Sequence, residues 1–240
     1  MGTGLTYLGK DLLERDDIDT DAFRATMLVS HLHWDHIQGL PFFRPLLRPG
    51  AAVDLIGPPQ EAGSLADAFA ECISPPVFPV ALTDLPGEIT YRTLHEETTT
   101  IGPASVTAFP VRHVGPTNGY RIEAGTGSVV FICDHQQPED GSLDVPVDVV
   151  DACRGADVLI HDTQYDAEEF VYRSNWGHCT PDFALELARQ AGVKRLVMFH
   201  HDPSHDDQWI KDQRDRLQEM AGGDVEVLAA AEGTSMVSGA

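Results

Sequence analysis

The sequence has few basic residues. Lys and Arg together number 16 against 38 Asp and Glu, which gives a formal net charge of -22 at pH 7. A surface of this sign repels phosphate backbones and steers large polyanions away, so we expect no long nucleic acid among the partners. A small-molecule anionic substrate stays compatible with this charge, because bound divalent cations reverse the electrostatic potential locally.

Membrane segments and paired cysteines are also lacking. No apolar stretch approaches the roughly 20 residues that a membrane-spanning helix needs, and no leader sequence opens the chain. We therefore expect a cytoplasmic protein with no membrane partner. The four cysteines, Cys72, Cys133, Cys153 and Cys179, form no Cys-x-x-Cys pair. This spacing favours reduced thiols over a disulfide framework or a zinc knuckle.

No linker-like stretch divides the chain, so we expect one domain spanning residues 1–240. Apolar β-branched runs alternate with segments of helical spacing, which predicts an α/β fold. The expected strands cover residues 25–29, 53–57, 90–94, 98–101, 105–111, 120–123, 129–133, 157–160, 193–199 and 225–229. The expected helices cover residues 37–43, 61–73, 180–191 and 204–220, and a shorter helical pattern runs through Leu8, Leu12 and Leu13.

The segment 30–36 carries the densest chemistry, because it places three histidines and one aspartate within six residues. It follows an expected buried strand, at whose carboxyl end catalytic loops are common. In an extended segment residues i and i+2 share a face, so His31 and His33 can bind one metal ion. Asp35 and His36 enter the next turn, from which they can reach a second ion. Two divalent ions suit hydrolytic chemistry.

This pattern resembles the metallo-β-lactamase superfamily, whose His-x-His-x-Asp-His motif is matched by residues 31, 33, 35 and 36. The resemblance implies an αβ/βα sandwich and a dinuclear metal-dependent hydrolase, with zinc as the expected metal and manganese as the alternative. In that superfamily several strands precede the motif, which here begins at residue 31. We therefore expect a fold that lacks its opening N-terminal strands, with an exposed sheet edge near residues 1–25 that favours a homodimer.

The resemblance also implies three further metal ligands, each just past an expected strand. One ion takes His31, His33 and His113, the other takes Asp35, His36 and His200, and Asp134 bridges the two. His135 is the alternative to Asp134, and His201 is the alternative to His200. Cys133 is set aside, because alternation along the strand turns its side chain to the opposite face from Asp134.

The stretch 176–181, Trp-Gly-His-Cys-Thr-Pro, precedes a helix that we expect Thr180 to cap. A histidine at this position can protonate a leaving oxygen, and a helix-capping histidine without chemistry is the alternative. The stretch resembles the Gly-His-Ser-Thr motif of the RNase Z and PhnP phosphodiesterase branch, in which this histidine assists the leaving group. Cys179 replaces the serine. Asp162 lies in a segment that resembles the supporting acidic motif, so it is expected to orient His178, with an N-cap role as the alternative.

The resemblance thus implies a phosphodiesterase that acts on a small phosphodiester, with cyclic phosphodiesters among the expected substrates. Its catalytic residues are Asp35, Asp162 and His178. Two other classes stay open. A lactone or thioester hydrolase would use the same ions but needs no acid for its leaving group. A non-catalytic metal-binding sensor would tolerate the loss of ligands, and here all seven positions are kept.

Overall fold

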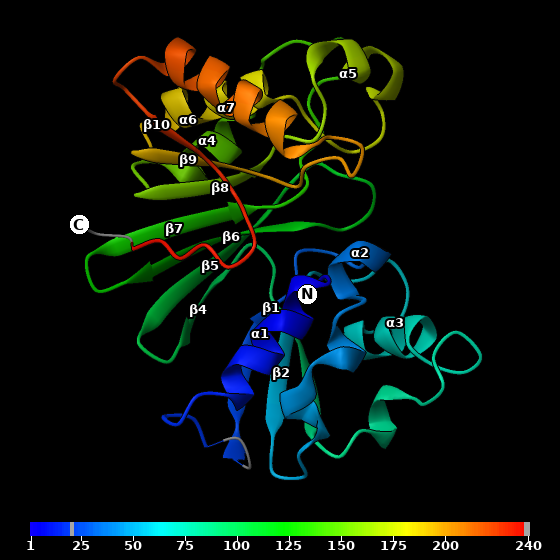
Figure 1. Ribbon diagram of the computed structural model, residues 1–240. Helices are drawn as coiled ribbons and strands as arrows, with labels where there is room; N and C mark the ends of the chain where they lie inside the picture. Colours follow the sequence, from blue (N-terminus) through cyan, green and yellow to red (C-terminus); the bar gives the residue numbers. More distant parts are fainter. Residues whose placement is uncertain (20–21, 238–240) are drawn as a thin grey trace. The chain divides into compact units, whose positions relative to one another are not determined.

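The computed structural model describes residues 1–19 and 22–237. The chain divides into two compact units, Met1–His95 and Glu96–Ala240, each with a sheet and helices of its own (Figure 1). Sheets accompanied by helices confirm the α/β class. The expectation of a single domain over residues 1–240 stays a prediction.

The first unit contains a three-stranded parallel sheet in the order β1-β2-β3. Its strands are β1 (Arg24–Leu28), β2 (Ala52–Gly57) and β3 (Glu88–Thr93), and its helices are α1 (Gly4–Leu13), α2 (Trp34–Ile37) and α3 (Leu65–Cys72). Parallel strands need long crossover connections, and α3 lies in the one between β2 and β3. Within the described residues β1 is an edge strand of this sheet. The absence of opening strands stays a prediction.

The core of the first unit is formed by apolar side chains from the sheet, α3 and the 3-10 turns η2 (Leu40–Phe42) and η3 (Arg44–Leu47). Leu55 and Phe69 are fully buried in it. Phe78, in the loop after α3, packs against the same core. The last 3-10 turn, η4 (Leu82–Asp84), follows that loop.

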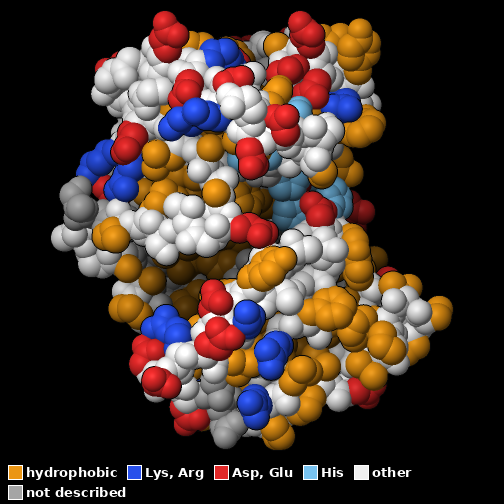
Figure 2. Space-filling view, in the orientation of Figure 1, with side chains coloured by type: hydrophobic (Ala, Val, Ile, Leu, Met, Phe, Trp, Pro, Cys, Tyr) orange, Lys and Arg blue, Asp and Glu red, His pale blue; other side chains and the backbone are white. Residues whose placement is uncertain are grey.

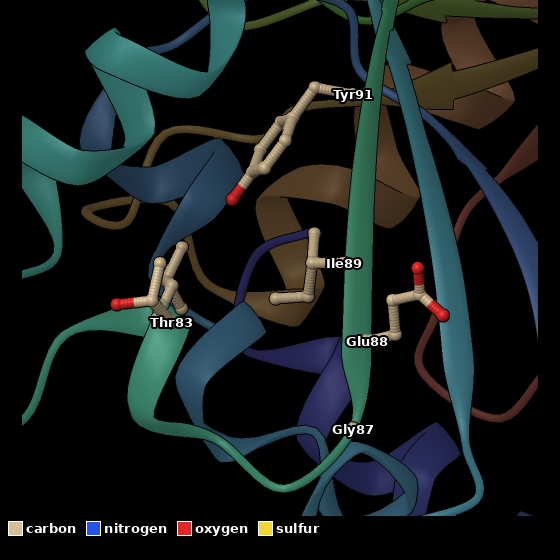
Figure 3. A pocket seen from close by; sticks show the side chains of 6 residues that line it. Thr83, Gly87, Glu88, Ile89 and Tyr91 are labelled. Atoms are coloured by element: carbon tan, nitrogen blue, oxygen red, sulfur yellow. The ribbon is translucent and has the colours of Figure 1, made fainter.

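A small pocket lies beside β3 in this unit. It has a volume of about 210 Å³ and is lined by residues including Thr83, Glu88, Ile89 and Tyr91. Ile89 and Tyr91 extend from one side of β3 toward Thr83, while Glu88 points to the other side, as the period of a strand requires (Figure 3). Burial raises the pKa of Tyr91, so its phenol stays neutral.

The second unit contains a seven-stranded mixed sheet in the order β10-β9-β8-β7-β6-β5-β4. Its strands are β4 (Thr98–Ile101), β5 (Ala104–Pro110), β6 (Asn118–Ala124), β7 (Gly127–Ile132), β8 (Val158–Asp162), β9 (Arg195–Phe199) and β10 (Glu226–Ala229). Its helices are α4 (Val147–Cys153), α5 (Ala167–Arg173), α6 (Pro181–Ala191) and α7 (Asp207–Ala221). Strands β6 and β7 are consecutive and pair antiparallel, so they form a hairpin.

Helices α4, α6 and α7 gather on one side of the larger sheet (Figure 1). Their apolar faces and the facing strand residues form one core, in which Val130, Leu159, Leu187 and Leu196 are fully buried. Helix α6 begins where the sequence predicts, because the Thr180 hydroxyl accepts a hydrogen bond from the Phe183 N–H. No helix among the described residues combines the length and apolar character that crossing a bilayer requires.

Two expected helices have different starts. The helix predicted over residues 37–43 is α2 followed by η2, because His33 keeps extended backbone and the helix begins at Trp34. The helix predicted from residue 204 begins at Asp207. Its N-cap is Asp206, which accepts a hydrogen bond from the Trp209 N–H.

Two short helices were not predicted. Helix α4 has only seven residues, too few for a clear helical period. Helix α5 begins with a capping box, in which Asp166 accepts from the Glu169 N–H and Glu169 accepts from the Asp166 N–H. Because this pair lies within an acidic run of the sequence, it does not stand out there as a helix start.

We expect Leu196→Ala to lower the free energy of unfolding by about 2 to 5 kcal/mol, because Leu196 is fully buried and its truncation leaves a cavity. Leu143→Ala is the matched control, since Leu143 is 40% exposed in the same unit, and we expect it to cost less than about 1 kcal/mol. Urea denaturation followed by circular dichroism measures both values. Equal losses would contradict the assignment of Leu196 to the core.

Candidate metal centre

The second unit brings its candidate functional side chains to one edge of the sheet. Strands β5 and β7 are both antiparallel to β6, and β7, β8 and β9 are parallel, so β5, β7, β8 and β9 run in the same direction. His113, Asp134, Asp162 and His200 lie at or just past the carboxyl ends of these strands. His178 precedes α6, which connects β8 to β9. Ligands of α/β proteins commonly bind at this edge.

Asp134 lies at the centre of this group. Its carboxylate is 1% exposed, and its Oδ2 is 3.4 Å from the His113 Nε2. Its Oδ1 is 3.7 Å from the His200 Nε2. Asp134, His178 and His200 offer ligand atoms that lie within 4.8 Å of one another. A buried carboxylate between imidazole nitrogens is a donor set that fits a divalent metal of the zinc type.

His113 is oriented by a backbone carbonyl. Its Nδ1 lies 2.7 Å from the Gly177 oxygen, and because a carbonyl can only accept, Nδ1 carries the proton. The lone pair of Nε2 is thereby left on the side of Asp134, as a metal ligand requires. Gly177 has a φ of +95°, and a Cβ at this residue would lie 2.4 Å from the His113 ring. Only glycine fits here without displacing the ring.

His178 is held by a buried aspartate. Its Nδ1 lies 3.0 Å from the Asp162 Oδ2 and donates to it, which leaves Nε2 available for a further contact. Asp162 is fully buried, and its oxygens also accept from the backbone N–H groups of His135 and Gln164. Tyr165 contacts the His178 ring edge to face, with 5.6 Å between centroids. These contacts fix both the tautomer and the direction of the imidazole.

His200 follows β9 with a left-handed backbone, φ +57°, which is uncommon for a residue other than glycine. Its ring stacks on that of His178, with 5.0 Å between centroids and 15° between planes. The structure thus brings His200 beside Asp134. His201 does not join that group, and burial lowers its pKa. His205 lies elsewhere, because its Nε2 bonds to the Glu169 carboxylate at 2.9 Å.

Beneath the group lies a pair of buried neutral histidines. The His161 Nδ1 donates to the Asp162 carbonyl oxygen at 2.7 Å, so its Nε2 accepts from the His135 Nδ1 at 2.9 Å. Burial lowers the pKa of both rings. The Cys179 thiol also donates to the Asp162 carbonyl, and burial raises its pKa. The thiol therefore packs below the aspartate, where the resembled motif has a serine.

Gln136 is a positioning residue that the sequence analysis missed. Its side-chain oxygen accepts from the Gly177 N–H at 2.7 Å, and its Nε2 donates to the Ser174 and Gln137 carbonyls. The next residue, Gln137, accepts from the N–H and hydroxyl of Thr180. The two amides join the loop after Asp134 to the loop that carries His178. Such contacts depend on the tertiary structure, so no local sequence pattern predicts them.

The first unit carries the motif of residues 31–36 at the carboxyl end of β1. The rings of His31 and His33 lie 4.5 Å apart between centroids, and those of His31 and His36 lie 4.4 Å apart. The His36 Nε2 is 3.1 Å from the Asp35 Oδ2. Ser30 bonds to the His31 Nδ1 at 3.2 Å, which orients that ring. Imidazoles packed this closely, with a carboxylate beside them, also fit a divalent metal.

Comparisons with known proteins agree with this geometry. Residues 21–201 match the model of the beta-lactamase superfamily domain. Ribonuclease Z of Ignicoccus hospitalis is 26% identical over 237 residues, covering 80% of this chain and 74% of the relative. The structure of human tRNase Z, short form, has a TM-score of 0.64 at 19% identity, and the match covers 100% of this chain and 86% of that one. The structure of a diphosphatase from the PhnP family has a TM-score of 0.62 at 20% identity, and the match covers 87% of this chain and 69% of that one.

These relatives correct one expectation from the sequence. The net charge of -22 led us to expect no long nucleic acid among the partners, and this was wrong, because the relatives include ribonucleases and a tRNase. Net charge sums over the whole surface, whereas a substrate meets one part of it. Bound divalent cations change the sign of the potential there, so the total cannot exclude a polyanion.

The family resemblance and the local geometry therefore lead to the same assignment. The family model spans most of the chain, and it includes the motif of residues 31–36, His113, Asp134 and His200. The fold implies divalent metal ions, and the donor groups of each unit suit them. The chain belongs to the metallo-β-lactamase superfamily and is a metal-dependent hydrolase.

Proposed function

We propose that the protein is a phosphodiesterase. The observation that carries this proposal is the His178–Asp162 pair beside Asp134. The buried carboxylate accepts a hydrogen bond from the His178 Nδ1, with 3.0 Å between the two atoms, and this leaves Nε2 available for a further contact. A carboxylate partner also stabilises the protonated imidazole, which a general acid needs. Alkoxide leaving groups of phosphodiesters require such an acid, whereas the thiolate of a thioester departs without a proton.

We further propose that the seven predicted ligands hold two zinc ions. One ion would be bound by His31, His33 and His113. The other ion would be bound by Asp35, His36 and His200, and Asp134 would contact both ions. The contacts within each unit support this, since the rings of His31, His33 and His36 are adjacent and Asp134 lies between His113 and His200. When bound, such ions polarise the phosphoryl oxygens and lower the pKa of the attacking water.

The remaining catalytic roles would be carried by side chains of the protein. Asp35 and Asp134 offer carboxylate oxygens that can accept the proton of the attacking water. His178 gives its Nε2 proton to the departing oxygen, and Asp162 keeps the imidazole oriented. Gly177 holds His113 by its carbonyl oxygen. The preference for a small or cyclic phosphodiester stays a prediction, and RNA belongs among the substrates to be tested.

Replacing His178 by Ala should lower kcat about 10²- to 10⁴-fold for a phosphodiester with an alkoxide leaving group, the usual range for one general acid. For a p-nitrophenolate leaving group, which departs without a proton, the loss should be much smaller. The comparison uses bis-p-nitrophenyl phosphate and a dinucleoside monophosphate, with metal content measured for each variant. Since Asp134, His178 and His200 are close enough to share an ion, loss of metal in this variant would indicate a ligand instead of an acid.

Asp162→Asn should reproduce the leaving-group dependence of His178→Ala, because an amide cannot stabilise the imidazolium. Equal losses on both substrates, with metal retained, would contradict the acid role. Hydrolysis of lactone or thioester substrates without phosphodiester hydrolysis would overturn the proposed function.

His113→Ala should lower the metal content from two ions toward one per chain, because it removes a proposed ligand. His95→Ala is the control, since it removes a histidine that is not a proposed ligand. Elemental analysis after dialysis measures the content. A chelator should abolish hydrolysis by the unaltered protein, and added zinc should restore it. Unchanged metal in His113→Ala would contradict the ligand set.

Gln136→Met should lower kcat roughly 10- to 100-fold for an alkoxide leaving group, because the loop of Gly177 and His178 loses its side-chain anchor. It should also weaken metal retention, since the Gly177 carbonyl no longer fixes His113. Gln190→Met is the matched control, because Gln190 is exposed on α6 and bonds to Glu186. A change in thermal stability alone would assign Gln136 a purely structural role.

A further inference from the structure

Helix α5 and the loop after it expose large apolar side chains. Val171 is 70% exposed, Tyr172 84% and Trp176 58%. Figure 2 shows hydrophobic side chains grouped with acidic ones over this part of the molecule. A pocket of about 420 Å³ lies here, lined by Glu168, Glu169, Tyr172 and Arg173. We call Tyr172, Arg173 and Trp176 the α5 aromatic surface.

Trp176 contacts Arg173 through its ring and through its backbone. The Arg173 guanidinium lies over the Trp176 ring at 5.7 Å and over the Tyr165 ring at 5.0 Å. The backbone N–H of Trp176 also donates to the Arg173 carbonyl at 3.0 Å. Because Trp176 is also 58% exposed, it offers a flat, oriented aromatic surface that suits stacking.

This surface adjoins the proposed acid. Trp176 and His178 are two residues apart, so their Cα atoms are at most about 8 Å apart. Gln136 fixes the peptide between them through the Gly177 N–H. Tyr165, which contacts the His178 ring, also contacts Arg173. A group stacked on Trp176 therefore lies near His178, the proposed proton donor to the departing oxygen.

We propose, on the basis of the phosphodiesterase function above, that the α5 aromatic surface binds a nucleobase of the leaving group. Stacking on an exposed Trp or Tyr suits any base and needs no sequence readout. The neighbouring carboxylates of Glu168 and Glu169 disfavour a phosphate here, so this surface contacts the base and leaves the phosphate to the metal centre. The base must be unpaired, as in a single-stranded end.

Kinetics with two matched substrates test the proposal. The leaving group of a dinucleoside monophosphate is a nucleoside, whereas that of the methyl ester of the same nucleotide is methanol, which has no base. Both substrates release an alkoxide. Trp176→Ala should lower kcat/KM about 5- to 100-fold for the first and less than about twofold for the second. Trp176→Phe should restore most of the loss. Val147→Ala, which truncates another exposed apolar residue of this unit, should have no effect.

Binding without turnover separates this proposal from the proposed function. In the full chain with Trp34→Phe and Trp209→Phe, Trp176 is the remaining tryptophan. Adenosine 5′-monophosphate should quench its fluorescence saturably, and ribose 5-phosphate, which lacks the base, should not. Equal quenching by both, or none by either, would overturn the nucleobase site even if phosphodiester hydrolysis is found. Quenching by the nucleotide alone, without any hydrolysis, would keep this site and reject the phosphodiesterase.

Discussion

The buried carboxylate of Asp162 is the contact on which the candidate site depends. It accepts hydrogen bonds from two backbone N–H groups, one in the loop after β7 and one just after β8, and from the imidazole of His178. Three segments of the second unit are therefore fixed relative to one side chain. A buried carboxylate with fewer donors would be costly, and this one has its oxygens satisfied. The position of Asp134 and the direction of His178 both follow from this arrangement.

Local signals made much of the fold predictable. Thr180 and Pro181 mark the start of α6, because a hydroxyl cap and a fixed φ act within one turn. The strands followed from apolar runs, and strand ends located Asp134 and His200. The start of α7 was misplaced because Ser204 bonds to Asp202 and Asp206 provides the cap. Gln136 was missed because its partners are about forty residues away and a lone glutamine carries no pattern.

The error about nucleic acids has a different origin. The net charge treats the surface as uniform. In the second unit, however, several histidines lie with Asp134 at one edge of a sheet, in a group that could bind a metal ion. The local charge at such an edge, and not the total charge of the surface, therefore decides whether a polyanion can bind there.

The peptide groups of Gly177 link the orientation of His113 to the position of His178. Its carbonyl oxygen orients His113, its N–H is held by Gln136, and the next residue is His178. Any rearrangement of this loop that re-aims the imidazole also turns the carbonyl, and so changes how firmly a metal is held. The orientation of His113 and the direction of the His178 imidazole are therefore coupled through the backbone of a single residue.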